Sequence, residues 1–500
     1  FTLSKIKQLA GQTMWYGLSS IAARFINYLL TPYLTYKFSN SEYGEMSMVY
    51  AFIPFMNVVF TYGMETAFFR FANTNDKQKV YSTTSISLLI STIAFSLILL
   101  VLSGQLTTLL QIELHKDYLM YAIAIIALDA LSSIAFAKLR QDGRPVKFAV
   151  VRVSSILVNV ISIYFFLSVC PRLLAQNPDH WCSAFFKPNW AVGYVLLANL
   201  IQSALTLVFL MKEFLGFKWK FDVQLWKQMM VYGLPLILAG FAGMINETFD
   251  RIMLGWLAPV DSIDAAKAEV GIYSACYKLS ILITLAVQAF RMGAEPFFFK
   301  QAEQKDAPKT YARVMKLFVI TLCFMFLAVV LYMDIWKQFI RNENMWVGLR
   351  VVPILLLANM FLGIYYNLSI WYKLSNKTIA GAYITLIGAA ITLVINYIFI
   401  PHVSYMACAW ATFACYGSMM VISFIWGQKE YPIPYAWKKL LTYIAIVVGL
   451  FFLHKGIIYL YSAVWFSLTT GTILFAVFTW FIVLVERKEL KKLPVLGNYL

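Results

Sequence analysis

Long apolar segments recur from one end of this 500-residue chain to the other. A helix needs roughly 20 consecutive apolar residues to cross a bilayer core about 30 Å thick, and we count about fourteen segments of that length. Hydrophobic residues make up 61% of the chain and charged residues only 13%, whereas an ordinary soluble domain is about 25% charged. Because lipid offers no partner for an unpaired backbone group, each segment should be helical. The sequence therefore predicts an all-α polytopic membrane protein.

The expected spans connect through short loops, which allows their orientation to be predicted. Loops on the cytoplasmic side of a membrane carry an excess of Lys and Arg. If the N-terminal Lys5 and Lys7 are placed in the cytoplasm, most of the 41 Lys and Arg side chains fall on the cytoplasmic side. We therefore expect both termini in the cytoplasm, and we interpret the net charge of +17 as a topology signal and a match to anionic lipid rather than as a nucleic-acid site. The approximate limits of the spans are 9 to 36, 45 to 69, 81 to 103, 117 to 138, 148 to 168, 190 to 211, 229 to 256, 269 to 293, 312 to 334, 349 to 372, 378 to 400, 404 to 426, 437 to 460 and 463 to 485.

A polar string at the end of the second span returns at the end of the eighth. "GMETAFFRFANTNDKQKVYSTT" (63–84) and "GAEPFFFKQAEQKDAPKTYARV" (293–314) share eight identities in 22 aligned positions, including Glu65 with Glu295. "YGL" likewise opens the first span at Tyr16 and the seventh at Tyr232. Six spans per repeat place the two copies parallel, as in many transporters. We expect two six-helix lobes (1–220 and 221–430), followed by two extra helices and a cytoplasmic tail (431–500).

Ionisable residues inside the spans are the candidate functional residues. A charge at the bilayer centre costs at least about 2.5 to 3.5 kcal/mol, so it should face a cavity or a partner. In the first span Arg24 and Asn27 lie on one polar helix face, and in the eighth span Lys278 and Arg291 add two cations. These four residues are the candidate substrate-binding residues, although Arg24 could instead bond backbone carbonyls and Arg291 could extend to the headgroups.

Acidic residues form a second candidate set, for coupling or gating. Asp129 stands alone near the middle of the fourth span and is either protonated or a coupling-ion site. Glu247 and Asp250 share a helix face in the seventh span, and Arg251 lies one turn beyond Glu247, a spacing that allows an internal ion pair. We interpret these three residues as a structural ion-pair cluster rather than a substrate site, because their charges largely cancel.

Glu65 and Glu295 lie near the cytoplasmic ends of equivalent helices. We expect each to pair with a neighbouring helix end in its own lobe, and a role in gating is the alternative.

The six cysteines divide between spans and one outer loop. Four lie inside spans, where they are expected to fill apolar space. Cys170 and Cys182 share the loop "CPRLLAQNPDHWC", and a disulfide between them is expected if that loop faces an oxidising compartment. No metal-ligand spacing is present, so we expect neither a metal nor a cofactor.

Several motifs resemble a known family. "INYIFIPHVSYMACAWATFACYG" (395–417) is similar to the eleventh and twelfth helices of Wzx-type polysaccharide flippases. "NSEYGEMSMVYAF" (40–52) and "VGIYSACYKL" (270–279) are similar to their second and eighth helices. These flippases belong to the polysaccharide transporter family of the multidrug/oligosaccharidyl-lipid/polysaccharide exporter superfamily. The resemblance implies two six-helix lobes around a central cavity. It also implies the transport of lipid-linked sugars across the bacterial inner membrane, for surface polysaccharides such as the O-antigen of lipopolysaccharide.

Three functions are compatible with these features. A flippase for a polyprenyl-pyrophosphate-linked oligosaccharide would use cations such as Arg24 and Lys278 to attract phosphates during alternating access. A multidrug or metabolite antiporter would prefer an acidic cavity for cationic drugs. A sugar polymerase or ligase would need a sizeable outer loop with catalytic groups, which is not seen, so we expect no enzyme. The expected partners are the lipid-linked oligosaccharide, membrane lipids and other polysaccharide assembly proteins, with no nucleic acid.

Overall fold

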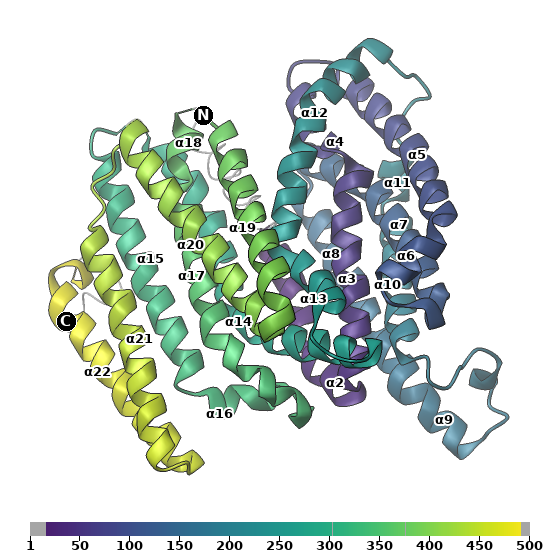
Figure 1. Cartoon of the computed structure of the whole chain (residues 1–500). Helices are drawn as coiled ribbons and strands as arrows, with labels where there is room; N and C mark the ends of the chain where they lie inside the picture. Colours follow the sequence, from purple (N-terminus) through teal and green to yellow (C-terminus); the bar gives the residue numbers. More distant parts are fainter. Residues whose placement is uncertain (1–16, 303, 376, 492–500) are drawn as a thin grey trace.

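A computed structural model describes residues 17–491 except 303 and 376, and throughout these residues the regular structure is helical (Figure 1). Twelve of the described helical stretches are long and apolar enough to cross a membrane, and the count is thirteen when α3 and α4 are taken as one span with a 40° bend. The first expected span, 9 to 36, begins outside the described residues; its described part is helical over 17–29 and continues into α2. The all-α polytopic fold is therefore confirmed.

The helices of the first half run from α2 to α11. Their bounds are α2 (Thr31–Lys37), α3 (Asn40–Thr61), α4 (Met64–Phe71), α5 (Lys77–Val101), α6 (Ser103–Leu109), α7 (Lys116–Gln141), α8 (Pro145–Tyr164), α9 (Cys170–Gln176), α10 (Ala191–Phe209) and α11 (Met211–Phe214). A π-helical turn, η2 (Phe165–Val169), joins α8 to α9, and short 3₁₀ turns are η1 (Glu113–His115) and η3 (Trp181–Ala184).

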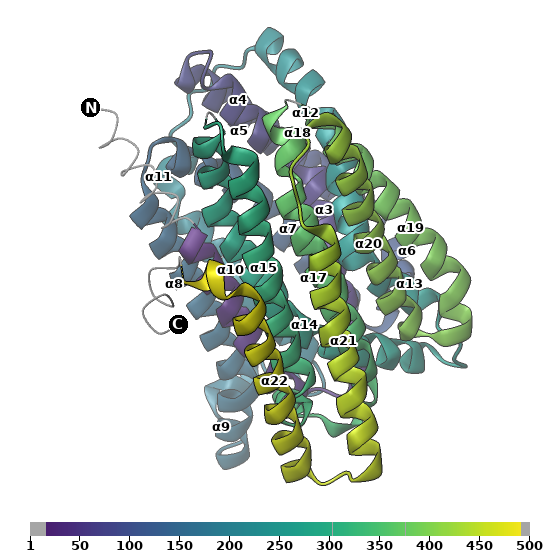
Figure 2. The same ribbon diagram turned by 90° about the vertical axis from the view of Figure 1, so that its left-hand side faces the viewer.

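The second half runs from α12 to α20 and is followed by two further helices. Their bounds are α12 (Val223–Met244), η4 (Ile245–Phe249), α13 (Asp250–Leu257), α14 (Ile263–Gln301), α15 (Ala307–Val330), α16 (Met333–Trp336), η5 (Lys337–Phe339), η6 (Glu343–Val351), α17 (Val352–Leu368), α18 (Ile370–Leu374), α19 (Ile379–Val403), α20 (Tyr405–Glu430), α21 (Trp437–Leu460) and α22 (Val464–Leu490). Figures 1 and 2 show α21 and α22 side by side at the edge of the second half, where both pack on α15.

The two halves are in contact through several helices. Helix α3 of the first half packs along α14 of the second, and α12 packs on α3, α4 and α5 as well as on α19. The division of the chain at 220 and 430 stays a prediction, because α12 contacts both sets of helices.

The "GMETAFFRF" string opens where α3 bends into α4. Tyr62 ends α3 with a φ of 30°, and Gly63 follows with a φ of 74°, a backbone conformation that favours glycine. A Cβ on Gly63 would also lie 2.5 Å from the carbonyl oxygen of Gly233 in α12. Only glycine allows both the bend and this close approach of the two halves.

The sequence repeat has equivalent contacts in the structure. A Cβ on Gly233 would lie 3.1 Å from the Tyr62 carbonyl oxygen, and one on Gly17 would lie 2.5 Å from the Met292 sulfur. The repeat alignment places Gly17 opposite Gly233 and Tyr62 opposite Met292, although Tyr16 of the "YGL" match lies outside the described residues. The opening helix of each half thus crosses the second span of the other half, as a parallel duplication requires.

Candidate functional site

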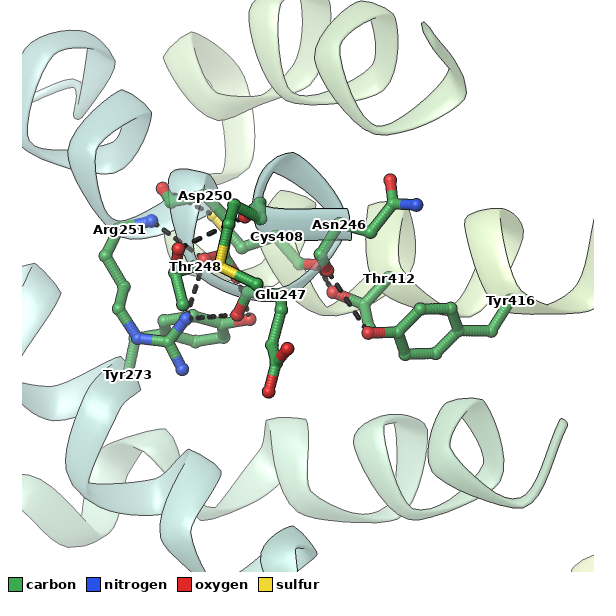
Figure 3. Close-up of polar contacts among 10 residues, drawn as sticks. Asn246, Glu247, Thr248, Asp250, Arg251, Tyr273, Cys408, Thr412 and Tyr416 are labelled. Atoms are coloured by element: carbon green, nitrogen blue, oxygen red, sulfur yellow. Dashed lines mark hydrogen bonds and ion pairs between the residues drawn. The ribbon is translucent and has the colours of Figure 1, made fainter. Parts of the chain in front are cut away.

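The seventh span is broken in its middle by the π-helical turn η4, between α12 and α13 (Figure 3). The turn is held by neighbouring helices: the Tyr416 hydroxyl donates to the Asn246 carbonyl over 3.2 Å, and the Asn246 amide donates to the Thr385 carbonyl over 3.3 Å. Thr392 donates to the Asn246 side-chain oxygen over 3.3 Å. The backbone carbonyl of Asn246 thus gains a partner from α20, as irregular backbone inside a membrane must, and the Asn246 side chain is held by two residues of α19.

Asp250 and Glu247 have different surroundings at this break. Asp250 is buried; the Tyr273 hydroxyl donates to it over 2.6 Å and the Arg251 guanidinium over 2.9 Å. Glu247 is exposed, and its carboxylate points away from the other labelled side chains in Figure 3.

Among the described residues, the ion pair of this cluster joins Arg251 to Asp250, and the pair that the spacing of Glu247 and Arg251 allows does not form. Arg251 donates to the Glu247 backbone carbonyl over 2.8 Å and forms its salt bridge with Asp250. The physical reason is the π turn, which adds a residue to the helical repeat and moves the Glu247 side chain off the face that a regular helix would share with Arg251.

Arg24 lies between the two halves. It is exposed, and it is within electrostatic range of Arg152 in α8 of the first half and of Tyr366 in α17 of the second. Asn27, one turn later, is also exposed. Among the described residues, Arg24 has no salt bridge and no side-chain hydrogen bond.

Lys278 is the second cation that the sequence placed in a span, and it lies on α14 close to Arg251. Arg251 is neutralised by Asp250 and rests 4.4 Å above the centre of the Tyr277 ring. Within the described part of the chain no carboxylate forms a salt bridge with Lys278. Lys278 is half-buried, and its charge is left without an acidic partner among the described residues.

Arg152 is a cation that the sequence analysis missed. It extends from α8 over the rings of Phe136 and Phe148, and it is within electrostatic range of both Asp129 and Arg24. Arg152, Ser155 and Asn159 follow one another at spacings of three and four, so this helix face could have been recognised as a polar stripe. We name Arg24, Arg152 and Lys278 the open cations, because none has a salt bridge to a described carboxylate.

The remaining candidates have local partners. Asp129 accepts a hydrogen bond from Ser203 over 2.8 Å. Arg291 forms a salt bridge with Glu295 over 3.2 Å and stacks on the Tyr366 ring at 4.8 Å. The structure therefore gives Arg291 partners inside the protein.

Glu65 and Glu295 make equivalent contacts in the two halves. Arg140, at the end of the fourth span, donates to Glu65, and Lys373, at the end of the tenth span, donates to Glu295 over 2.6 Å. Each glutamate thus ties the second span of its half to the fourth, as expected from the repeat.

A different contact joins α3 to α14 at the ends that we expect to face outward. Lys267 donates to Glu45 over 3.1 Å, and both side chains are buried. The helices approach so closely that a Cβ on Gly44 would lie 1.8 Å from the Lys267 carbonyl oxygen, and one on Gly271 would lie 2.0 Å from that of Asn40. We name this group of residues the outer contact; the sequence analysis did not find it.

Cys170 and Cys182 lie beside each other, both buried and both free thiols in the structure, with an interaction between their side chains. The bridge between them stays a prediction.

If their loop faces an oxidising compartment, mass spectrometry of peptides from non-reduced protein should find Cys170 joined to Cys182. Two unmodified thiols in protein prepared without reductant would contradict the bridge, and Cys276, a buried thiol inside a span, serves as the unreacted control.

Proteins of known structure share this fold over most of the chain. The lipid II flippase MurJ in an inward closed conformation matches with a TM-score of 0.68 at 14% identity, covering 95% of this chain and 99% of that one. An inward-facing multidrug resistance MATE family transporter of the MOP superfamily matches with a TM-score of 0.58 at 12% identity, covering 83% of this chain and 94% of that one. An outward-facing multidrug resistance MATE family transporter of the same superfamily matches with a TM-score of 0.54 at 13% identity, covering 85% of this chain and 94% of that one.

Fold and site together define a polytopic membrane protein with the architecture of these flippases and exporters. Residues 9–301 match the family described as polysaccharide biosynthesis protein, and the chain belongs to this family. The family resemblance found in the sequence is confirmed. No curated protein matches the chain at a significant level.

Proposed function

We propose that this protein is a flippase that moves a polyprenyl-pyrophosphate-linked oligosaccharide from the cytoplasmic to the outer leaflet of the inner membrane, for surface polysaccharide biosynthesis. The observation that carries this proposal is the set of open cations, which come from both halves and have no described carboxylate partner. A pyrophosphate leaving water needs fixed positive charge and hydrogen-bond donors that replace its hydration. Family membership and the flippase fold support the same substrate class.

Alternating access supplies the movement in this proposal. The lipid tail stays in the bilayer while the charged headgroup crosses between the halves, and the outer contact opens to release it on the far side. Asp129 and Glu247 are the acidic groups proposed for coupling to an ion. A drug antiporter is less well supported, because the open cations Arg24, Arg152 and Lys278 would repel cationic drugs.

Deletion of the gene in its host tests the proposal. Surface polysaccharide should be lost while its lipid-linked precursor accumulates, and in spheroplasts that precursor should be protected from membrane-impermeant periodate. Restoring the gene should reverse both effects. Absence of the precursor would instead indicate a role in its synthesis, and a precursor fully accessible to periodate would contradict a flipping step.

A further inference from the structure

The segment that joins the two halves alternates aromatic and basic side chains. Residues 216–222, "GFKWKFD", place Lys218 and Lys220 between the rings of Phe217, Trp219 and Phe221. Trp219 is 75% exposed and Phe221 42% exposed, so both rings lie on the surface of the protein. Aromatic rings beside lysines are typical of the interface between membrane and cytoplasm.

This joining segment is fixed against the start of α5. The Gln78 amide donates to the Gly216 carbonyl over 2.9 Å, and the Lys218 backbone N–H donates to the Ser82 hydroxyl over 2.9 Å. The Asp222 N–H donates to Thr83 over 3.3 Å. The position of the two lysines is therefore set by hydrogen bonds rather than left to a free loop.

A half-open cavity of about 550 Å³ lies between α5 and the joining segment. Three lysines line it, Lys79 from α5 and Lys218 and Lys220 from the segment, together with the Ser82 hydroxyl. The volume accommodates a phosphate group with part of a glycerol backbone, and the hydroxyl and ammonium groups are donors that suit phosphate oxygens.

The two aspartates of the cavity are already engaged. Asp222 caps α12 by accepting from the Leu225 N–H over 2.8 Å, and it forms a salt bridge with Lys79. The Leu225 amide and Lys79 lower the pKa of Asp222, so this carboxylate stays ionised. Asp76 caps α5 by accepting from the Lys79 N–H over 2.9 Å. Neither Lys218 nor Lys220 has a salt bridge to a described residue.

We propose that this cavity binds the phosphate headgroup of an anionic phospholipid of the cytoplasmic leaflet. Lys218 and Lys220 bind the phosphate, and the exposed rings of Trp219 and Phe221 lie among the lipid chains and headgroups beside it. Because the joining segment connects α11 to α12, a bound lipid holds the link between the two halves against α5. This site is outside the set of open cations, and the inference holds whatever substrate the protein moves.

Native mass spectrometry of the full chain in detergent tests the proposal with phosphatidylglycerol and phosphatidylcholine that carry identical acyl chains. The protein should bind the anionic lipid more tightly. Each basic residue at an anionic surface contributes roughly fivefold to binding, so the variant with both Lys218→Gln and Lys220→Gln should lose roughly 30-fold in affinity for phosphatidylglycerol and little for phosphatidylcholine.

The sequence repeat offers a matched control. Lys305→Gln with Lys309→Gln removes two exposed lysines at the start of α15, which the repeat places opposite the start of α5, and neither of them lines the cavity. This variant should bind phosphatidylglycerol like the unaltered chain. Equal loss in both double variants would overturn the proposal, because the effect would then be one of overall charge.

Two further arms use the unaltered chain, so the result does not depend on how a variant folds. Equal binding of phosphatidylglycerol and phosphatidylcholine would overturn the proposal. Inorganic phosphate at constant ionic strength should displace little of the bound lipid; full displacement would show that the cavity takes soluble phosphate instead. Preference for a polyprenyl phosphate over phosphatidylglycerol would assign the cavity to the transported lipid, and would overturn the phospholipid assignment.

Discussion

Replacing Arg24 by alanine is expected to lower export of the surface polysaccharide at least about tenfold while the protein stays in the membrane at its normal level. The variant should fold, because Arg24 is exposed and has no salt bridge within the described residues. Export should fall because the substrate phosphates would lose a charge-assisted contact, and such a contact contributes about 1.5 to 3 kcal/mol, or roughly 10- to 100-fold in binding. Complementation of a deletion strain measures export, and immunoblotting of membranes measures protein level.

Two further variants show what kind of contact Arg24 makes. Arg24→Lys should keep part of the activity if a point charge suffices, and little if phosphate needs the planar fork of the guanidinium. Arg172→Ala is the matched control, because Arg172 is exposed on α9, away from the open cations. Full export by Arg24→Ala at normal abundance would show that Arg24 does not bind substrate, and would leave Arg152 and Lys278 as the candidates.

The sequence predicted the spans, and it predicted that each of the two repeated glutamates pairs with a neighbouring helix end. The spans were predictable because lipid imposes the same requirement on every crossing segment: about 20 apolar residues with all backbone groups bonded internally. Pairing of Glu65 and Glu295 with a neighbouring helix end was predictable because the repeat places both at equivalent helix ends, whereas Arg140 and Lys373 are 75 and 78 positions away and were not identified in advance.

The break in the seventh span and the contacts between the halves could not be predicted in the same way. A regular helical period assigns Glu247 and Arg251 to one face, and nothing local in the sequence shows that a π turn intervenes. Glu45 and Lys267 are separated by 222 positions, so their pairing depends on how two distant helices cross. Arg152 was missed for a simpler reason: near the start of its span it was counted as a topology signal, although Ser155 and Asn159 continue a polar face from it.

Joining the two halves covalently at the outer contact is expected to stop export and to do so reversibly. The Ser41 hydroxyl and an Asp264 carboxylate oxygen, one from α3 and one from α14, are 3.4 Å apart, and both residues are accessible at the surface. With Ser41→Cys and Asp264→Cys in one chain, an oxidant should form a disulfide between the helices. Since a linked molecule cannot open outward, remaining export should equal the unlinked fraction, and a reductant should restore it.

The structure of the outer contact explains why it should open in every cycle. A buried ion pair such as Glu45 with Lys267 gives little net stabilisation, because the cost of removing two charges from water offsets their attraction. When water enters between the halves, both charges regain their hydration, so the pair can separate without leaving an unpaired charge in an apolar site. Gly44 and Gly271 add close packing in the closed state but no side chain that must be withdrawn.

The controls separate this opening from general damage. Chains with Ser41→Cys alone or Asp264→Cys alone, treated with the same oxidant, should export normally. In the single and double variants alike, Cys170 and Cys182 are replaced by serine, which prevents disulfide exchange with these native thiols. The linked fraction is measured by the mobility of protein cleaved between α3 and α14, before and after reduction. Normal export by fully linked protein would show that α3 and α14 stay together at their outer ends during transport, and alternating access would then have to proceed through another pair of helices.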